Sequence, residues 1–286
     1  MKIEEIAEYM RKNIEKNCTV EGTAKEFGYS KFEFSKKFKR KTGFSASRFL
    51  SFLKIEKALD IIINENEDII TSQIRTGYNS SGTFSNIFKK YTGISPSNYK
   101  KTIKEFYKII REYINSSGIE EISYARSLKI SKNNTKNFLC VNLVYPENYE
   151  SEITFLGLFK NCVPDDFPDF GKVLISDKTK SRCIFENIPE RKYWLMGCSI
   201  KKGSDLKEFF YLKDSIRAKE NKAIVLPTDN EYTLKFRKPV SSDFPVLINI
   251  PKLVKEVTEI NTESILSVSD NEWFLIILFF MDSEYI

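Results

Sequence analysis

Two short segments, fifty residues apart, combine cationic and hydrogen-bonding side chains with a spaced pair of phenylalanines. The first spans residues 31–41, and the second spans residues 81–91. In each segment the phenylalanines at i and i+4 share one face of a helix, so polar and basic residues take the opposite face. Lys and Arg neutralise phosphates, whereas Ser, Lys and Asn hydrogen-bond to base edges. The chemistry that these segments favour is therefore recognition of a nucleic acid.

An internal repeat explains why the two segments are alike. At an offset of 50 residues, one series of residues meets its equivalents: Phe34, Ser35, Phe38, Lys39, Thr42, Gly43 and Ser45. Upstream the offset falls to 49, where Gly28-Tyr29 meets Gly77-Tyr78, so the second copy carries one extra residue. An ordered series of this length indicates a duplicated unit.

Each copy predicts a helix, a tight turn and a second helix. In the first copy the spacing predicts a short helix over 20–27, with Thr19 as its N-cap and Gly28 at the positive-φ position after it. Ser30 caps the next helix. The second copy repeats this arrangement over 70–76 and 81–91. We expect four phenylalanines to form the core of the two units: Phe34, Phe38, Phe84 and Phe88.

A single helix is predicted between the copies. Residues 47–65 carry apolar side chains at helical spacing without a break. A helix of that length is rigid. It would hold the two basic helices at a fixed separation, of which about one turn of B-DNA is the useful value.

Over about residues 5–102 the chain resembles the AraC/XylS family of bacterial transcription regulators. The motifs that carry the resemblance are Ala24-x-x-x-Gly28-Tyr29-Ser30, Phe38-Lys39-x-x-x-Gly43-Phe44-Ser45, Leu53-Lys54-Ile55-x-x-Ala58 and Gly93-Ile94-Ser95-Pro96-x-x-Tyr99. The resemblance implies that both basic helices enter adjacent major grooves on one face of double-stranded DNA. The positions that it assigns to base contacts are Phe32, Ser35, Lys36, Ser81, Gly82, Thr83 and Asn86.

The remaining cations of the two helices are candidates for phosphate contacts, which set affinity and orientation without sequence preference. They are Lys31, Lys37, Lys39, Arg40, Lys89 and Lys90, and Lys36 also suits this role. Gly82 has no side chain to contact a base, and Asn86 replaces a commonly basic residue. The first unit is therefore expected to discriminate bases more than the second. Gln73 replaces a small Ala of the family, which should loosen packing or place an amide near phosphate.

The composition limits catalysis and sets the charge of each part. The chain has no histidine, which excludes Ser-His and Cys-His nucleophile pairs, and its five cysteines are scattered without C-x-x-C spacing. We expect no catalytic residue, no metal ligand and no cofactor. Residues 1–115 carry 22 Lys and Arg against 14 Asp and Glu, a net charge of +8, and the remainder carries 23 against 25, a net charge of −2. A polyanionic partner suits only the first part.

A second domain is expected after the break at residues 116–118. The predicted domains are a DNA-binding domain over 1–115 and a mostly-β sandwich over 119–286, so the fold class is multi-domain α + β. Strands are predicted at 138–145, 154–159, 172–176, 182–185, 192–199, 231–237 and 246–250. The order of segments around Phe155–Phe159 and Tyr193–Met196 resembles transthyretin-like and carboxypeptidase-regulatory-like sandwiches, although Arg191 stands where that family has Gly.

The aromatics of this domain favour a core role, and Trp194 and Tyr193 are the candidates for contact with an effector. The carboxylates Asp165, Asp166 and Asp169 favour a solvated loop over a cation site. The run at residues 273–281 is too short to span a bilayer and predicts a strand, one that would add to the sheet or pair with another subunit.

The leading hypothesis is a cytoplasmic, sequence-specific transcription regulator that binds double-stranded DNA. Its β domain would sense a small-molecule effector or mediate self-association as a homodimer, and RNA polymerase is a further candidate partner. The alternative is a DNA-tethered adaptor whose β domain binds a protein partner and no metabolite. An enzyme is the weakest hypothesis, because no paired carboxylates stand out.

Overall fold

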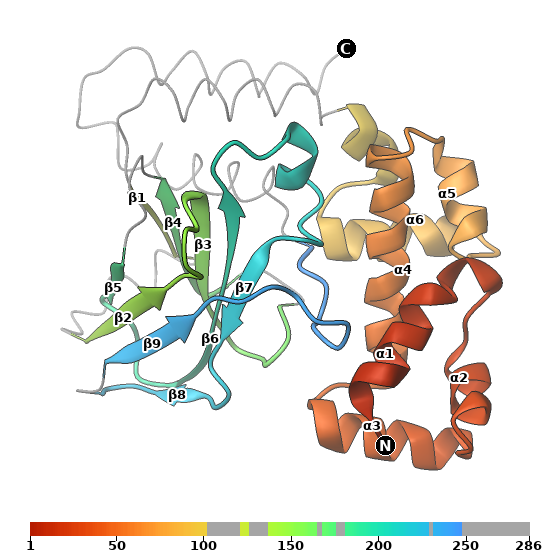
Figure 1. Ribbon diagram of the computed structural model, residues 1–286, viewed down its shortest axis with the longest axis horizontal. Helices are drawn as coiled ribbons and strands as arrows, with labels where there is room; N and C mark the ends of the chain where they lie inside the picture. The colour runs from red at the N-terminus through yellow and green to blue at the C-terminus, as the bar shows by residue number, and fades with distance from the viewer. Residues whose placement is uncertain (102–120, 126–136, 165–167, 176–180, 229–230, 248–286) are drawn as a thin grey trace. The chain divides into compact units, whose positions relative to one another are not determined.

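The computed structural model describes residues 1–101, 121–125, 137–164, 168–175, 181–228 and 231–247 (Figure 1). By its internal contacts the chain divides into Met1–Asn249 and Ile250–Ile286, and the second unit lies wholly outside the described residues. Within the first unit, a helical region is followed by a β-rich region with two sheets. This order confirms the predicted fold class.

The first helix-turn-helix unit follows the predicted local signals. Its elements are α1 (Ile3–Lys12), the 3₁₀ turn η1 (Ile14–Lys16), α2 (Val20–Glu26) and α3 (Lys31–Thr42). The Thr19 hydroxyl accepts a hydrogen bond from the Gly22 amide at 2.9 Å, and the Ser30 hydroxyl accepts one from the Glu33 amide at 3.2 Å. Both side chains are therefore N-caps, as predicted. Gly28 turns the chain between the helices at φ 71°.

The long helix and the second unit also form where the pattern places them. They are α4 (Ala46–Ile63), α5 (Ile69–Arg75) and α6 (Ser81–Thr92), with Asp68 and Ser80 as the N-caps of α5 and α6. The turn between α5 and α6 contains Gly77 at φ 72°, which repeats the turn of the first unit. In Figure 1, α3 and α5 lie toward opposite ends of α4. Residues 96–101 are helical.

The four phenylalanines predicted as core are buried. Phe34, Phe38 and Phe88 are 0% exposed and Phe84 is 1% exposed. The rings of Phe34 and Phe38 lie 5.8 Å apart, and those of Phe84 and Phe88 lie 5.7 Å apart. The duplicated sequence therefore builds two cores of the same design.

The β-rich region contains nine described strands in two sheets. They are β1 (Glu121–Ala125), β2 (Phe138–Val144), β3 (Ser151–Phe159), β4 (Phe170–Ile175), β5 (Arg182–Glu186), β6 (Lys192–Lys201), β7 (Ile216–Lys219), β8 (Ile224–Val225) and β9 (Tyr232–Lys235). The larger sheet has the order β1-β4-β3-β6-β7 with β8 paired to β6, and the smaller has the order β5-β2-β9. β2 and β9 are parallel, and the other pairs are antiparallel.

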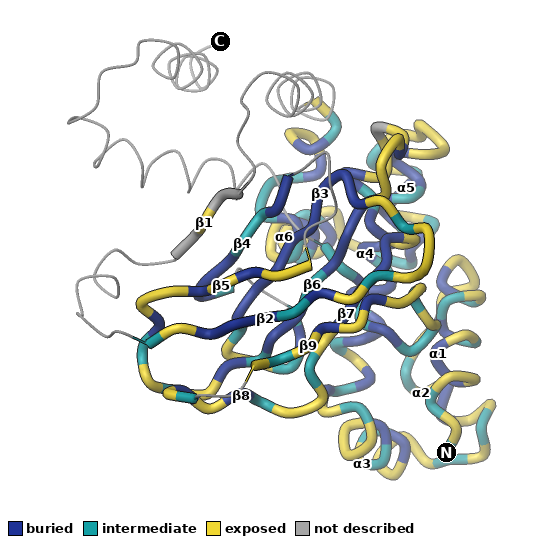
Figure 2. Tube along the Cα trace, turned by 60° about the vertical axis from the view of Figure 1, so that its left-hand side comes forward, coloured by how far each residue is buried: buried dark blue, intermediate teal, exposed yellow. Residues whose placement is uncertain are grey.

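One hydrophobic core joins the two sheets, as in a sandwich. It contains Leu139 and Phe185 from the smaller sheet and Leu158 and Tyr193 from the larger one, all at most 1% exposed. Figure 2 shows β3 and β6 buried over most of their length, whereas β5 and β8 carry more exposed residues. The sheets thus pack face to face around apolar side chains.

Six of the seven predicted strands form, with ends shifted by up to three residues. The prediction over 246–250 is wrong for residues 246 and 247, which are in no strand, and residues 248–250 lie outside the described residues. β1, β7 and β8 were not predicted. β7 has the sequence Ile-Arg-Ala-Lys, which is half charged, and β8 has two residues, so neither carries a strand pattern of its own. The boundary at 116–118 and the apolar run at 273–281 lie outside the described residues.

Candidate nucleic-acid interface

The helices α3 and α6 present the same pattern of exposure, position by position. Over residues 31–40 and 81–90 the buried, half-buried and exposed positions coincide at the offset of 50. Only the paired phenylalanines are buried in these stretches. Both helices therefore keep one face free of the protein, and apart from Phe32, Glu33 and Gly82 the exposed residues of these faces are polar or basic.

The side chains predicted to contact bases all lie on these free faces. In α3, Phe32 and Lys36 are exposed and Ser35 is half-buried, with its hydroxyl donating to the Lys31 carbonyl at 2.8 Å. The oxygen of the Ser35 hydroxyl remains able to accept a hydrogen bond from another molecule. In α6, three predicted side chains are exposed: Ser81, Thr83 and Asn86. Phe32 is 79% exposed, more than any other large hydrophobic residue in the described part of the chain.

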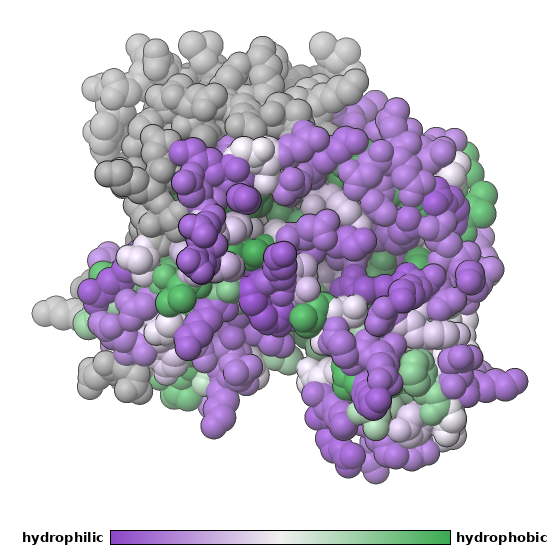
Figure 3. Space-filling view, in the orientation of Figure 1, coloured by the Kyte–Doolittle hydropathy of each residue, from purple (hydrophilic) through white to green (hydrophobic). Residues whose placement is uncertain are grey.

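The cations of α3 fall into two groups. Lys31 forms an ion pair with Glu21 at 3.2 Å, and Lys37 forms one with Glu33 at 2.6 Å. Within the described residues no ion pair occupies Lys36, Lys39 or Arg40 of α3, or Lys89 and Lys90 of α6. The second group is therefore available to phosphates without breaking an ion pair, and within it the Lys90 ammonium lies 5.7 Å from the centre of the Tyr91 ring. Hydrophilic side chains cover most of the helical elements on the face shown in Figure 3.

Gln73 plays a different part from either one expected. Its side-chain amide donates to the Tyr78 carbonyl at 3.1 Å and so closes the turn between α5 and α6. From α4, the Lys54 ammonium donates to the Gly77 carbonyl at 3.2 Å and lies 5.2 Å from the centre of the Tyr78 ring. Burial lowers the pKa of Lys54.

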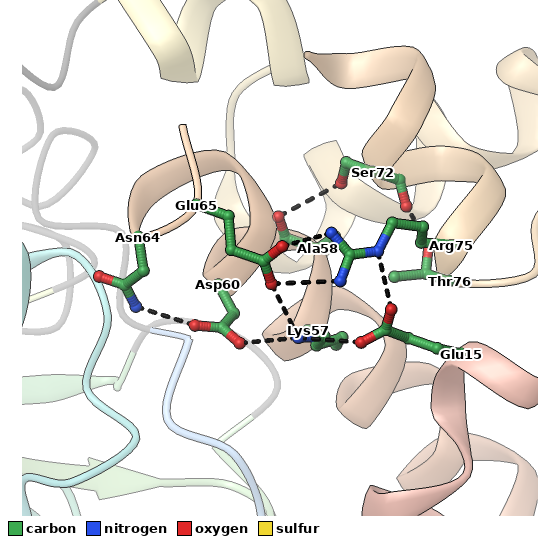
Figure 4. A network of polar contacts seen from close by, with 9 residues as sticks. All are labelled: Glu15, Lys57, Ala58, Asp60, Asn64, Glu65, Ser72, Arg75 and Thr76. Atoms are coloured by element: carbon green, nitrogen blue, oxygen red, sulfur yellow. Dashed lines mark hydrogen bonds and ion pairs between the residues drawn. The ribbon is translucent and has the colours of Figure 1, made fainter. Parts of the chain in front are cut away.

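A network of charged side chains fixes the second unit to the long helix (Figure 4). Arg75 of α5 forms ion pairs with Glu15, at 2.7 Å, and with Glu65. Lys57 of α4 contacts the same two carboxylates, at 3.0 and 3.1 Å, and also Asp60 at 3.0 Å. The hydrogen bonds from Arg75, with those from Lys57, lower the pKa of Glu15 and of Glu65.

The composition of this network was not predicted. Glu15, Glu65 and Arg75 are separated by 50 and 10 residues along the chain, and no helical spacing links the three. At the centre of the same contact, the Ser72 hydroxyl donates to the Ala58 carbonyl at 3.2 Å and is fully buried. A small polar residue at this position lets α5 approach the backbone of α4 closely. α5 is therefore held against α4 by charge and by close backbone contact.

The two effector candidates differ in their exposure. Tyr193 is 0% exposed in the core of the sandwich, where its hydroxyl accepts a hydrogen bond from the Arg191 Nε at 2.9 Å and donates to the Pro189 carbonyl at 3.2 Å. Trp194 is half-buried. The half-buried indole of Trp194 is thus the more accessible of the two.

Asp169 differs from the solvated loop that the sequence predicts. It is 2% exposed and forms ion pairs with Lys160 at 3.4 Å and Arg191 at 3.1 Å, whereas Asp165 and Asp166 lie outside the described residues. Burial of a carboxylate requires such partners. Among the described residues no three His, Cys, Asp or Glu side chains are grouped to hold a metal ion. In the same part of the chain, no helix combines the length and apolarity needed to cross a bilayer.

Comparisons with known proteins cover about a third of the chain. A family model described as "Helix-turn-helix domain" matches residues 23–102. The multiple antibiotic resistance protein MarA of Escherichia coli (strain K12) is 28% identical over 100 residues, which cover 35% of this chain and 79% of MarA. The MmsAB operon regulatory protein of Pseudomonas aeruginosa is 30% identical over 97 residues, 34% of this chain and 32% of that protein.

Among solved structures, the C-terminal domain of AraT, a response regulator from Geobacillus stearothermophilus, is 28% identical. It covers 35% of this chain and 84% of that one, with a TM-score of 0.33. The family match includes α3, α4, α5 and α6. Residues 23–102 of this chain therefore form an AraC-type helix-turn-helix domain, a DNA-binding module of transcription regulators.

Proposed function

We propose that the protein is a sequence-specific transcription regulator whose α3 and α6 enter adjacent major grooves on one face of a DNA duplex. The observation that carries the proposal is the matching exposure of the two helices, each with a buried phenylalanine pair and a free basic face. A B-DNA major groove admits one α-helix. Two equivalent helices joined by α4 suit two grooves.

The free faces hold chemistry for reading bases as well as for binding phosphates. Lys36 donates to the acceptors N7 and O6 of guanine, and Asn86 pairs with the donor and acceptor edge of adenine. The cations that form no ion pair within the described residues supply phosphate contacts: Lys39, Arg40, Lys89 and Lys90. Because Gly82 contributes no side chain, the first unit carries more of the base discrimination.

The relatives support this assignment. The protein of Pseudomonas aeruginosa is named as an operon regulatory protein, and 79% of MarA aligns with 100 residues of this chain. A regulatory function for the helix-turn-helix region is consistent with the name of the Pseudomonas aeruginosa protein. The expected cytoplasmic location belongs to the same proposal.

Selection of bound duplexes from a random pool, followed by competition gel shifts, tests the proposal. The full-length protein is expected to enrich one motif and to prefer it to random DNA by about 10³-fold or more at physiological salt. Lys36→Ala should lower that preference more than it lowers binding to random DNA. Equal competition by random and selected duplexes would show that regulation through a specific site is wrong.

For the β-rich region we propose self-association. One face of the smaller sheet carries three exposed apolar side chains, Phe138 at 58%, Val144 at 46% and Ile184 at 41% exposure. They lie on β2 and β5, where the alternate residues fill the core. Apolar residues that share an exposed face mark an interaction surface.

Light scattering of the full-length protein tests this part. A dimer that becomes a monomer in Phe138→Ser/Ile184→Ser supports self-association. A monomer at all concentrations contradicts it, and a thermal-shift screen then separates the remaining roles. A metabolite that raises the melting temperature favours an effector domain with Trp194 at its site, whereas a co-purifying protein favours an adaptor.

A further inference from the structure

Five aromatic rings form an unbroken series between the two basic helices. The ring centres of Phe38 in α3 and Phe44 are 5.9 Å apart, and those of Phe44 and Phe244 are 4.9 Å apart. The ring centres of Phe244 and Phe52 of α4 are 4.1 Å apart, and those of Phe52 and Tyr91 of α6 are 3.9 Å apart. The middle ring of the series, Phe244, follows the last strand of the β-rich region, 142 residues beyond the end of the helix-turn-helix match.

The backbone beside Phe244 is held from the β-rich region. Arg217 of β7, 7% exposed, donates from Nη1 to the Phe244 carbonyl at 3.2 Å. The neighbouring Asp243 carboxylate receives two hydrogen bonds of 2.7 Å from Arg237, which follows β9. The backbones of Arg217 and Arg237 also bond to each other, at 2.9 and 3.0 Å, which ties the two sheets together at this point.

The same segment is held from the helical side. Arg11 of α1 donates to the Ser241 carbonyl and to the Asp243 carbonyl, each at 2.9 Å. The Ser242 amide donates to the Glu4 carboxylate at 3.1 Å. The helical region and the β-rich region therefore both hold the backbone next to Phe244, which fixes its half-buried ring between the rings of Phe44 and Phe52.

We propose that Phe244 is a positioning residue that fixes the separation of α3 and α6, and with it the spacing of DNA half-sites that the protein accepts; this rests on the proposed function. Close-packed rings on both sides of Phe244 resist sliding, because interiors are dense and a small displacement forfeits many contacts. Each base pair added between half-sites rotates the second by about 35°. If the separation of the helices is fixed, this rotation lowers the affinity for the duplex. If the separation can vary, the protein keeps more of its affinity.

The experiment uses the full-length protein and duplexes that carry the selected motif with zero, one or two base pairs inserted between its half-sites. A further duplex carries the first half-site alone. The wild type is expected to lose affinity steeply with each insertion. Phe244→Ala is expected to reduce the one-base-pair penalty by about fivefold, the size of coupling that contacting residues show. Its affinity for the first half-site alone should stay within about twofold of wild type.

Two further variants separate positioning from stability. Phe244→Leu keeps the apolar volume, remains folded and should restore part of the spacing penalty. Phe236→Leu changes a phenylalanine that is 5% exposed in the core of the β-rich region, and should lower stability without altering the spacing penalty. An unchanged penalty in both Phe244 variants, or an equal loss of affinity on every duplex, would overturn the proposal while leaving the regulator function intact. If the wild type selects no motif, the proposed function fails and this inference falls with it.

Discussion

The ammonium group of Lys37 lies 4.8 Å from the centre of the Tyr29 ring, so this lysine of α3 is turned back toward its own unit. Its ion pair with Glu33, at 2.6 Å, holds it from the other side. The sequence places Lys37 among the phosphate contacts, together with Lys39. The geometry separates the two, because a lysine already held by an aromatic ring and a carboxylate must break both contacts to reach DNA.

Lys39→Gln and Lys37→Gln therefore should differ in the salt dependence of DNA binding. Loss of one phosphate contact lowers the slope of log K against log salt by about 0.9. Lys39→Gln is expected to show that change, and Lys37→Gln is expected to show much less. Fluorescence anisotropy titrations from 50 to 200 mM salt measure both slopes. Equal slopes for the two variants would contradict the separation of roles.

Phe32 should discriminate thymine from uracil. A phenyl ring has no hydrogen-bonding group, and the apolar feature that the major groove offers it is the 5-methyl group of thymine. Replacing the contacted thymine by uracil removes that methyl alone and should weaken binding about fourfold, since a buried CH₂ is worth about 0.8 kcal/mol.

Phe32→Ala should abolish that difference and leave the melting temperature nearly unchanged, because the ring is 79% exposed. Scanning each thymine of the first half-site with both proteins measures the effect. Val225→Ala, which removes another exposed apolar side chain, 54% exposed and in the β-rich region, is the control. A variant that still distinguishes the two bases would remove Phe32 from the contact.

Glu56→Gln should destabilise the fold. Glu56 of α4 is 6% exposed and forms an ion pair with Arg11 of α1. The Arg11 side chain is 20% exposed and keeps its hydrogen bonds to the Ser241 and Asp243 carbonyls, so losing the charged partner should cost about 1.5–3 kcal/mol. Urea unfolding followed by circular dichroism measures the loss. Glu8→Gln breaks an exposed pair with Lys12 and should cost about 0.5 kcal/mol or less.

The network around Arg75 makes stability depend on pH in the acid range. Hydrogen bonds from Arg75 first, and then from Lys57, lower the pKa of Glu65, and Arg75 lowers that of Glu15 in the same way. The unfolded carboxylates, with an ordinary value of 4.5, bind protons more readily than the folded ones. Their contribution is therefore full above pH 4.5 and is lost as the pH falls through the lower folded pKa.

Arg75→Met removes the main cause of both shifts. It should lower the melting temperature at pH 7 by about 2 °C and flatten the decline below pH 4.5. Calorimetry between pH 3 and pH 7 measures both effects. A variant that declines as steeply as the wild type in acid would assign the pH dependence to other carboxylates.

Local signals account for the parts of the helical region that sequence predicts. Caps, turns and the paired phenylalanines act within a few residues, so Thr19, Ser30 and Gly28 fix element ends before any tertiary contact forms. The duplication then repeats a correct prediction in the second unit. Exposure of Phe32, Lys36 and Asn86 follows from the same helical periodicity.

Contacts between distant residues account for what the sequence did not predict. Phe244, Arg75 and Asp169 each contact residues that lie far away in the sequence. No helical or strand periodicity relates these partners to one another. β7 and β8 are set by pairing with β6 rather than by their own composition, since β propensity depends on neighbouring strands. Gln73 satisfies a turn carbonyl that only the folded turn presents.

Hydroxyl-radical footprinting of the full-length protein on its selected duplex tests the central claim most directly, that α3 and α6 read two successive grooves. Two protected windows on one face, with centres about one helical turn apart, are predicted. Asn86→Ala should weaken the second window alone, and Lys36→Ala the first. A single window, or two that lie on opposite faces of the duplex, would contradict the claim.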